Sequence, residues 1–95
     1  MNEIHFEYDS AKAASNVLKH GVSFELATRV FFDPFRIEAH DQSENYGEDR
    51  WATIGMVDYG VLYVVYTVRD GDTIRLISAR KANEKERKHY HQANT

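Results

Sequence analysis

The sequence predicts an α+β domain in which helices pack on an antiparallel sheet. Helix-type apolar spacing between residues 10 and 31 gives way to strand-like alternation between residues 51 and 78, and a last helix signal follows at residues 83–92. The 95 residues contain no repeat and no low-complexity tract. We therefore expect one domain over residues 1–95, built around a single core.

The composition excludes several classes of protein. The chain has no cysteine, which rules out disulfides, thiol chemistry and zinc sites built from cysteine. Hydrophobic residues make up 42% and charged residues 28% of the chain, as in an average folded domain. No apolar run is long enough to span a bilayer, and the N-terminus has no secretory signal. We expect a cytoplasmic protein that contacts no membrane and uses no metal or other cofactor.

The N-terminal part predicts a short strand at residues 5–8 and a first helix from Ser10 to about His20. Asp9 is placed to cap this helix at its start, and Gly21 is placed to end it in a left-handed turn. Three apolar residues share one stripe of the helix and are its predicted contact with the core: Ala14, Val17 and Leu18.

A second helix should begin after Ser23, whose hydroxyl can cap it. Asp33 and Pro34 should end it, because proline disfavours helical backbone in the residue before it. The predicted buried face of this helix consists of Phe24, Ala27, Val30 and Phe31.

Three or four strands should form the antiparallel sheet. Residues 61–68 are apolar on both faces and predict a central strand, and Asp70-Gly71 is the strongest hairpin signal in the chain. Residues 40–49 are polar and turn-rich, which indicates a loop. The other predicted strands are residues 35–39, 51–56 and 73–78.

Charge is divided unevenly along the chain. The net charge is −3, but residues 1–68 carry five basic and eleven acidic side chains, whereas residues 69–95 carry seven basic and four acidic ones. The basic end includes a predicted C-terminal helix, which should begin at a capping box of Asn83 and Glu86 and reach about Gln92. Such a region can attract a polyanion, or its charges can pair with each other on a solvated helix face.

Two arginines at strand ends point to a phosphate site. Arg69 ends the predicted central strand and Arg80 closes the last strand, and a guanidinium group matches phosphate oxygens bidentately. Both could reach one phosphate on the sheet surface, or both could form a sheet rim satisfied by carboxylates and backbone carbonyls. Arg75 alternates with Leu76 and should face solvent.

Two further positions offer acid–base chemistry. Glu48 and Arg50 are two residues apart at the entry to a strand, so they can lie side by side in a site or form an exposed ion pair. His20 ends the first helix beside Lys19, where the helix dipole favours the protonated imidazole and so suits a general acid. The alternative is that His20 caps the last carbonyls of the helix.

Several blocks of residues occur in a recognisable order. The two most specific are Lys19-His20-Gly21-Val22-Ser23-Phe24 and Ile77-Ser78-Ala79-Arg80-Lys81-Ala82. Further blocks are Phe6-Glu7-Tyr8-Asp9, Val30-Phe31-Phe32-Asp33-Pro34, Gly47-Glu48-Asp49-Arg50 and Val64-Val65-Tyr66-Thr67-Val68-Arg69. This order resembles that of the BrnT family of bacterial toxins from about residue 6 to residue 91. The sequence departs from the family at Tyr8, where the family usually has Trp, and in the loop at residues 40–45.

The resemblance implies the toxin of a type II toxin–antitoxin system with a RelE-like fold. That fold has two N-terminal helices, an antiparallel sheet of three to four main strands and a C-terminal helix. The implied activity is a metal-independent endoribonuclease that inhibits translation and growth. The implied partners are an RNA substrate and a BrnA-like antitoxin in a hetero-oligomer. DNA would be contacted only indirectly through the antitoxin, which agrees with the net negative charge of the chain.

Cleavage of RNA through its 2′-hydroxyl needs a base, an acid and cations around the phosphate. The residues assigned to the scissile phosphate are Arg50, Arg69 and Arg80. The assigned base is Glu48, and the acid is Lys19 or His20. The residues assigned to the rest of the RNA, with the two rings stacking on bases, are Tyr66, Lys81 and Tyr90.

Two other functions fit the same residues. A relic toxin or co-repressor could hold its antitoxin without cleaving RNA, since arginines at strand ends also suit an acidic peptide. An RNA-binding domain without cleavage is the second alternative. Toxicity on expression without an antitoxin would argue against the first, and a short ribbon-helix-helix gene immediately downstream would argue against the second.

Overall fold

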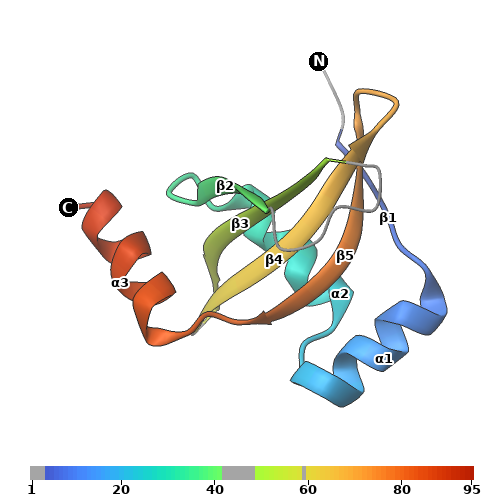
Figure 1. The fold of residues 1–95 in the computed structure, drawn as a ribbon, viewed down its shortest axis with the longest axis horizontal. Coiled ribbons are helices and arrows are strands. Elements are labelled where there is room, and N and C mark those ends of the chain that lie inside the picture. Colours follow the sequence, from blue (N-terminus) through green and yellow to red (C-terminus); the bar gives the residue numbers. More distant parts are fainter. Residues whose placement is uncertain (1–3, 42–48, 59) are drawn as a thin grey trace.

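The computed structural model describes residues 4–41, 49–58 and 60–95. Within these ranges the chain has the predicted α+β architecture (Figure 1). In chain order the elements are β1 (His5–Glu7), α1 (Ser10–His20), α2 (Phe24–Thr28), the 3-10 helix η1 (Arg29–Phe32), β2 (Ile37–Asp41), β3 (Arg50–Val57), β4 (Gly60–Arg69), β5 (Thr73–Lys81) and α3 (Glu84–Ala93).

The strands form one mixed sheet in the order β1-β5-β4-β3-β2. β4 lies between β3 and β5, which confirms the predicted central strand. Neighbouring strands are antiparallel except at one edge, where β1 runs parallel to β5 and pairs Glu7 with Arg75. The prediction of an antiparallel sheet with three to four strands is therefore wrong in detail. β1 reaches this edge because Phe6 packs on the core, with its ring centroid 5.5 Å from that of Phe31.

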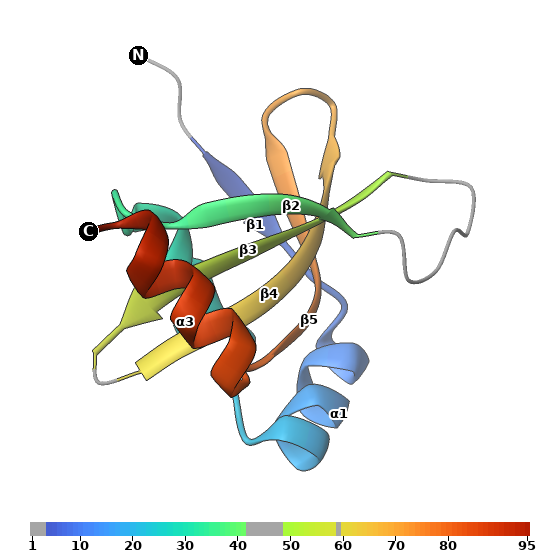
Figure 2. The same cartoon turned by 60° about the vertical axis from the view of Figure 1, so that its left-hand side comes forward.

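Helices lie on both faces of the sheet (Figure 2). α2 and η1 pack on one face, which we call the α2 face and which includes Leu62 and Val64 of β4. The opposite face, which we call the α3 face, includes Val61 and Tyr63, and there Tyr90 of α3 packs against the sheet. None of the described helices is long and apolar enough to cross a membrane.

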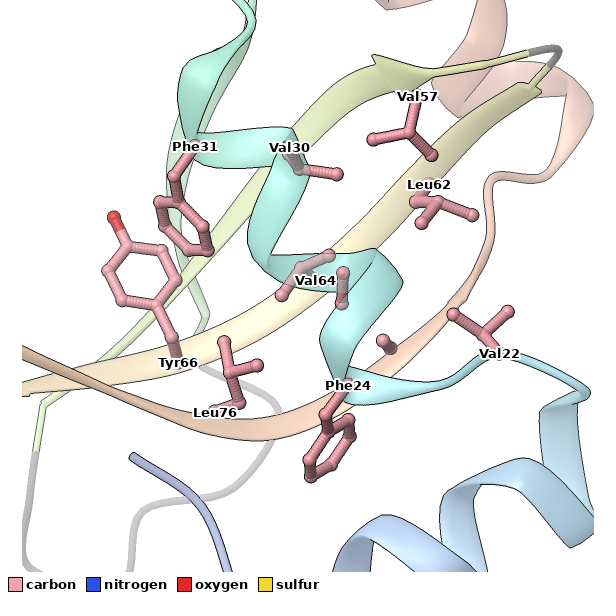
Figure 3. Close-up of a cluster of buried hydrophobic side chains, with 11 residues drawn as sticks. Val22, Phe24, Val30, Phe31, Val57, Leu62, Val64, Tyr66 and Leu76 are labelled. Carbon is pink, nitrogen blue, oxygen red and sulfur yellow. The ribbon is translucent and has the colours of Figure 1, made fainter. Parts of the chain in front are cut away.

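The larger core lies on the α2 face, between the sheet and the second helix (Figure 3). Phe24 and Val30 from the helical layer are 1% and 0% exposed, and they pack with Val64 and Leu76 from the sheet. Removing a side chain of this size from water contributes about 1.5–3 kcal/mol to stability. This layer therefore fixes the position of the sheet from which the candidate site is built.

The second helix differs from its prediction in form. α2 ends at Thr28 and the chain continues as the 3-10 helix η1, although the four residues of the predicted buried face are all buried. The tighter 3-10 turn begins only at Arg29, and Val30, its second residue, is buried in the same core as Ala27 of α2. Val30 then lies against Gly55 of β3, where an added methyl group would come within 2.7 Å of Val30 Cγ1. The close approach of η1 to the sheet therefore requires glycine at residue 55.

α1 has the predicted bounds and caps, but its buried side is not the predicted one. Asp9 accepts hydrogen bonds at the start of the helix, and Gly21 ends it with a φ of 70°. Leu18 is 88% exposed and Val17 is 46% exposed, and Ala14 is exposed as well. The apolar stripe that we expected to contact the core therefore faces solvent.

The orientation of α1 follows from one buried amide, that of Asn16. Its Nδ2 donates to the backbone oxygens of Ala79 (2.8 Å) and Val22 (2.9 Å), and its Oδ1 accepts from the backbone N–H of Ala79 (3.1 Å). Asn16 thus pairs with the edge of β5 as a neighbouring strand would. A buried backbone group without a partner is costly, so these bonds outweigh the burial of Leu18.

Replacing Asn16 with alanine should lower the free energy of unfolding by about 2–4 kcal/mol, because it leaves buried backbone groups of β5 and of Val22 without partners. Urea unfolding of the variant and of the wild type measures this loss. Ser15→Ala, at an exposed position one residue away, is the control and should change stability by less than about 0.5 kcal/mol. Equal stability of the two variants would mean that Asn16 does not anchor α1.

A carboxylate links α3 to the rest of the domain. Asp33 accepts hydrogen bonds from the hydroxyl of Tyr90 (2.5 Å) and from the backbone N–H groups of Met56 (2.8 Å) and Phe35 (2.9 Å). Burial acts to raise the pKa of Asp33, but these hydrogen bonds outweigh it and lower the pKa. Asp33 therefore remains ionised at neutral pH and holds α3 against β3.

The remaining elements follow their predictions closely. β2 runs from Ile37 to Asp41 rather than over residues 35–39, a shift of two residues. The hairpin between β4 and β5 turns at Asp70 and Gly71, which both have positive φ, 56° and 79°. The predicted capping box of Asn83 and Glu86 opens α3.

Candidate active site

Three arginines surround Thr67 on the α3 face of the sheet. Arg75 of β5 pairs directly with Thr67 of β4, and Arg69 lies two residues further along β4 on the same face. On the other side of β4, the register of β3 places Arg50 opposite Thr67. The hydroxyl of Thr67 donates to the backbone oxygen of Asp49 at 2.7 Å, which ties the two strands together beside Arg50.

A carboxylate lies among these arginines. Oε1 of Glu7 is 3.2 Å from Nη1 of Arg75 and 3.8 Å from Nε of Arg69. The side chains of Glu7, Arg69 and Arg75 are 42%, 50% and 29% exposed, so a ligand can reach them from solvent. We call Glu7, Arg50, Arg69 and Arg75 the arginine cluster. With strands about 4.8 Å apart, the Cα atoms of Arg50 and Arg75 are about 10 Å apart, and their guanidinium groups can meet on one phosphate.

Arg80 lies on the same face but outside the arginine cluster. Arg69 pairs with Thr73, and Arg80 follows Thr73 by seven positions (80 − 73) along β5. At about 3.3 Å per residue this separation is about 20 Å, so the two guanidinium groups meet at one phosphate only if both side chains extend fully toward each other along the sheet. Arg80 is instead held at α3 by Glu86, so the arrangement does not favour the prediction that Arg69 and Arg80 grip one phosphate, and Arg75 lies nearer to Arg69.

An irregularity in β5 is the reason that Arg75 and Arg80 share a face. Residues five apart on a regular strand point to opposite faces. The register between β4 and β5 shifts beside Val65, and Ile77 has no partner in β4. Ile77 is therefore a β-bulge, which adds one residue to β5 and returns Arg80 to the α3 face.

Arg80 is held by α3 and by an aromatic ring. Its Nη1 and Nη2 donate to the two carboxylate oxygens of Glu86 at 2.8 and 2.9 Å, and its guanidinium carbon is 4.2 Å from the centroid of the Tyr63 ring. The hydrogen bond to Glu86 raises the pKa of Arg80, and the same bond lowers the pKa of Glu86. Both groups are therefore ionised, and Arg80 is a fixed cation beside α3.

The two tyrosines that we expected to stack on bases are buried, each only 5% exposed. Tyr66 points to the α2 face, packs edge-on against Phe31 and donates its hydroxyl to Glu38 at 2.6 Å; burial is the main cause that raises its pKa. Burial, followed by the hydrogen bond to Asp33, raises the pKa of Tyr90 to about 12. Neither ring is open to a base, so the stacking prediction is wrong for both.

Lys19 and His20 lie at a depression between α1 and β5, beside the bulge. The depression has a volume of about 240 Å³. Ser78 of β5 lines it and pairs with Val65, which places Ser78 on the α3 face between Arg75 and Arg80. The residues that line the depression are Lys12, Ser15, Asn16, Lys19, His20, Ile77 and Ser78.

The other predicted residues fall elsewhere. Lys81 pairs with Leu62 of the α2 face, so it points away from the arginines and its assignment to this site is wrong. Glu48, the predicted base, lies outside the described residues. The sequence did not indicate Glu7 as a site residue, because nothing near Glu7 indicates that β1 pairs with β5. The sequence also predicted that Arg75 faces solvent. Among the described residues, no group of three or more His, Cys, Asp or Glu side chains could hold a metal ion.

Comparison with known proteins identifies both the fold and the family of the chain. The crystal structure of the ribonuclease toxin BrnT from Brucella abortus matches with a TM-score of 0.65 and 20% identity, over 86% of this chain and 100% of that chain. The fold is therefore that of a small α+β bacterial toxin. The family described as "Ribonuclease toxin, BrnT, of type II toxin-antitoxin system" matches residues 8–86. The chain belongs to this BrnT family, and its role as a toxin implies an antitoxin partner. No curated protein sequence matches it.

Proposed function

We propose that this toxin is a metal-independent endoribonuclease that inhibits translation and growth. The observation that carries the proposal is the arginine cluster, in which three guanidinium groups and one carboxylate share one face of the sheet. Guanidinium groups neutralise the charge that develops on a phosphate in the transition state, and they match its oxygens in pairs. The description of the family as ribonuclease toxins supports the same activity.

In the proposed reaction the 2′-oxygen of the RNA attacks the adjacent phosphorus while its proton passes to a base. The bond from phosphorus to the 5′-oxygen breaks, and that oxygen takes a proton from an acid. The products are a 2′,3′-cyclic phosphate and a free 5′-hydroxyl. Arg50, Arg69 and Arg75 bind the reacting phosphate. Arg80, fixed beside α3, contacts another phosphate of the same strand.

Glu7 is the base that the described residues offer. Its carboxylate is bound to Arg75 and Arg69 and is 42% exposed, so it lies beside the position proposed for the reacting phosphate. Glu48 is the alternative base that the sequence indicates. His20 is the proposed acid. It lines the depression between α1 and β5, which borders the α3 face at Ser78.

We further propose that a BrnA-like antitoxin binds this toxin in a cytoplasmic hetero-oligomer and makes the DNA contacts of the complex. Membership of a type II toxin–antitoxin family supports a protein partner, and large apolar side chains are exposed to contact one. Leu18 is 88%, Phe32 is 69% and Phe35 is 60% exposed. The half-exposed guanidinium of Arg69 favours the second candidate function, a non-catalytic module that binds an acidic antitoxin segment, since guanidinium groups pair with carboxylates as well as with phosphates.

The purified protein should cleave RNA in the presence of EDTA, and DNA of the same sequence should stay intact because it has no 2′-hydroxyl. Gel electrophoresis measures cleavage, and mass spectrometry of the fragments should find 2′,3′-cyclic phosphate ends. RNA that is bound but not cut would identify an RNA-binding domain instead. A protein that neither binds nor cuts RNA, but binds its antitoxin, would be the non-catalytic module.

A further inference from the structure

We propose that the depression between α1 and β5 binds a second phosphate of the RNA strand, next to the phosphate at the arginine cluster. This inference rests on the proposed function, because it takes a single RNA strand as the ligand. The proposed ligand is a phosphodiester group, which lysine ammonium groups and serine hydroxyls hold. Nothing in the sequence pattern of α1 alone indicates it, because Ser78 comes from a distant strand.

The depression collects groups that bind phosphate oxygens. Lys12, Ser15 and Lys19 are spaced so that they share one side of α1, and Ser78 faces them from β5. Lysine and serine side chains are common partners of nucleic-acid phosphates. Asn16 also lines the depression, but its amide is committed to backbone groups, so it forms a fixed wall rather than a ligand.

The cations of this depression form no salt bridge with a carboxylate in the part of the chain that the structure describes. None of Lys12, Lys19 and His20 forms an ion pair with a described residue, whereas Arg80 on the same sheet is paired with Glu86. Asp9, the carboxylate nearest to Lys12 in sequence, accepts hydrogen bonds from backbone N–H groups at the start of α1, and its charge attracts Lys12 without forming a salt bridge. The C-terminal end of the helix dipole amounts to only about −0.5 charge, so two lysines leave the depression positive.

The depression is continuous with the proposed site. Ser78 lies between Arg75 and Arg80 on the α3 face, and it also lines the depression. An RNA strand can place one phosphate at Arg75 and then leave the sheet over the edge of β5. On this path it passes Ser78 and meets Lys12 and Lys19. The bulge at Ile77 makes this possible, because it sets the register in which Ser78 pairs with Val65.

The test uses a fluorescent 2′-O-methyl RNA, which binds but cannot be cleaved through a 2′-hydroxyl. Fluorescence anisotropy at several salt concentrations compares the wild type with the double variant Lys12→Ala/Lys19→Ala. We expect the affinity of the double variant for this RNA to fall about tenfold. The negative slope of log K against log salt should become shallower by about 0.7 for one lost phosphate contact. The matched control is Lys85→Ala/Lys88→Ala on α3, which removes the same charge from exposed positions.

A depression variant that binds with the affinity and the salt slope of the control would overturn this inference. If the wild type still cleaves RNA in EDTA in that case, the proposed function stands and only the second phosphate site is lost. If the wild type neither binds nor cleaves RNA, the proposed function and this inference fail together. Both double variants replace exposed side chains, so their thermal unfolding should match the wild type.

Discussion

Replacing Arg75 with alanine should lower kcat for RNA cleavage by about 10²–10³-fold, the effect of removing one preorganised donor to a developing negative charge. The side chain of Arg75 is less exposed than that of Arg69, and Arg75 stands between Thr67 and Glu7 in the register of the sheet. Loss of its guanidinium removes charge neutralisation that matters most in the transition state. Steady-state kinetics on a short RNA in EDTA measure the change.

Two other arginines define the controls for this measurement. Arg29, on η1, pairs with Asp58 and is 62% exposed, so Arg29→Ala should keep kcat within about twofold of the wild type. Arg80→Ala should raise KM more than it lowers kcat, because Glu86 holds Arg80 at α3, away from the proposed position of the reacting phosphate. A larger loss of kcat in Arg80→Ala than in Arg75→Ala would show that the reacting phosphate binds at the end of the sheet beside α3.

Replacing Glu7 with glutamine should lower kcat by about 10²–10⁴-fold, the usual contribution of a positioned base. A carboxylate base works only when ionised, so kcat of the wild type should rise with pH on the acid side of its profile. The variant lacks this titration, and that limb should disappear. A pH–rate profile therefore separates a base from a residue that only positions Arg69 and Arg75, whose loss would lower kcat and keep the limb.

Stability should barely change in Glu7→Gln. The ion pairs of Glu7 are at least partly exposed to solvent, and such pairs contribute about 0–1 kcal/mol. A free energy of unfolding in urea more than about 2 kcal/mol below that of the wild type would show that Glu7 mainly holds β1 on β5. A variant that is stable, folded and as active as the wild type would leave Glu48 as the base.

Local signals were enough to predict most of the elements. Asp9 and Gly21 bound the first helix, Asp70-Gly71 marks the last hairpin, and the box that begins at Asn83 opens α3, all as expected. Each of these signals acts within four residues, through a hydrogen bond or a backbone angle that the residue type itself favours. The α+β class and the central strand follow from the same kind of evidence.

Three long-range features were beyond such signals. Asn16 turns α1 so that its apolar stripe faces solvent, through bonds to Ala79 that lie 63 residues away in sequence. β1 pairs with β5 in parallel, which brings Glu7 to the arginines. The bulge at Ile77 changes the face on which Arg80 lies. The arginine cluster depends on the pairing of β1 with β5, so the sequence indicated Arg50 and Arg69 but neither Glu7 nor Arg75.

The amide of Asn16 has a consequence for how this sheet meets other chains. An uncovered strand border invites pairing with a foreign strand and the growth of aggregates. β1 shields residues 73–75 of β5, and Asn16 takes up the backbone groups of Ala79, so this border is blocked. Among the described strands, β2 borders the sheet on the opposite side and pairs with β3 alone. Any chain that lengthens the sheet, whether from an antitoxin or from a second toxin, therefore has to add at β2 or along the three residues of β1.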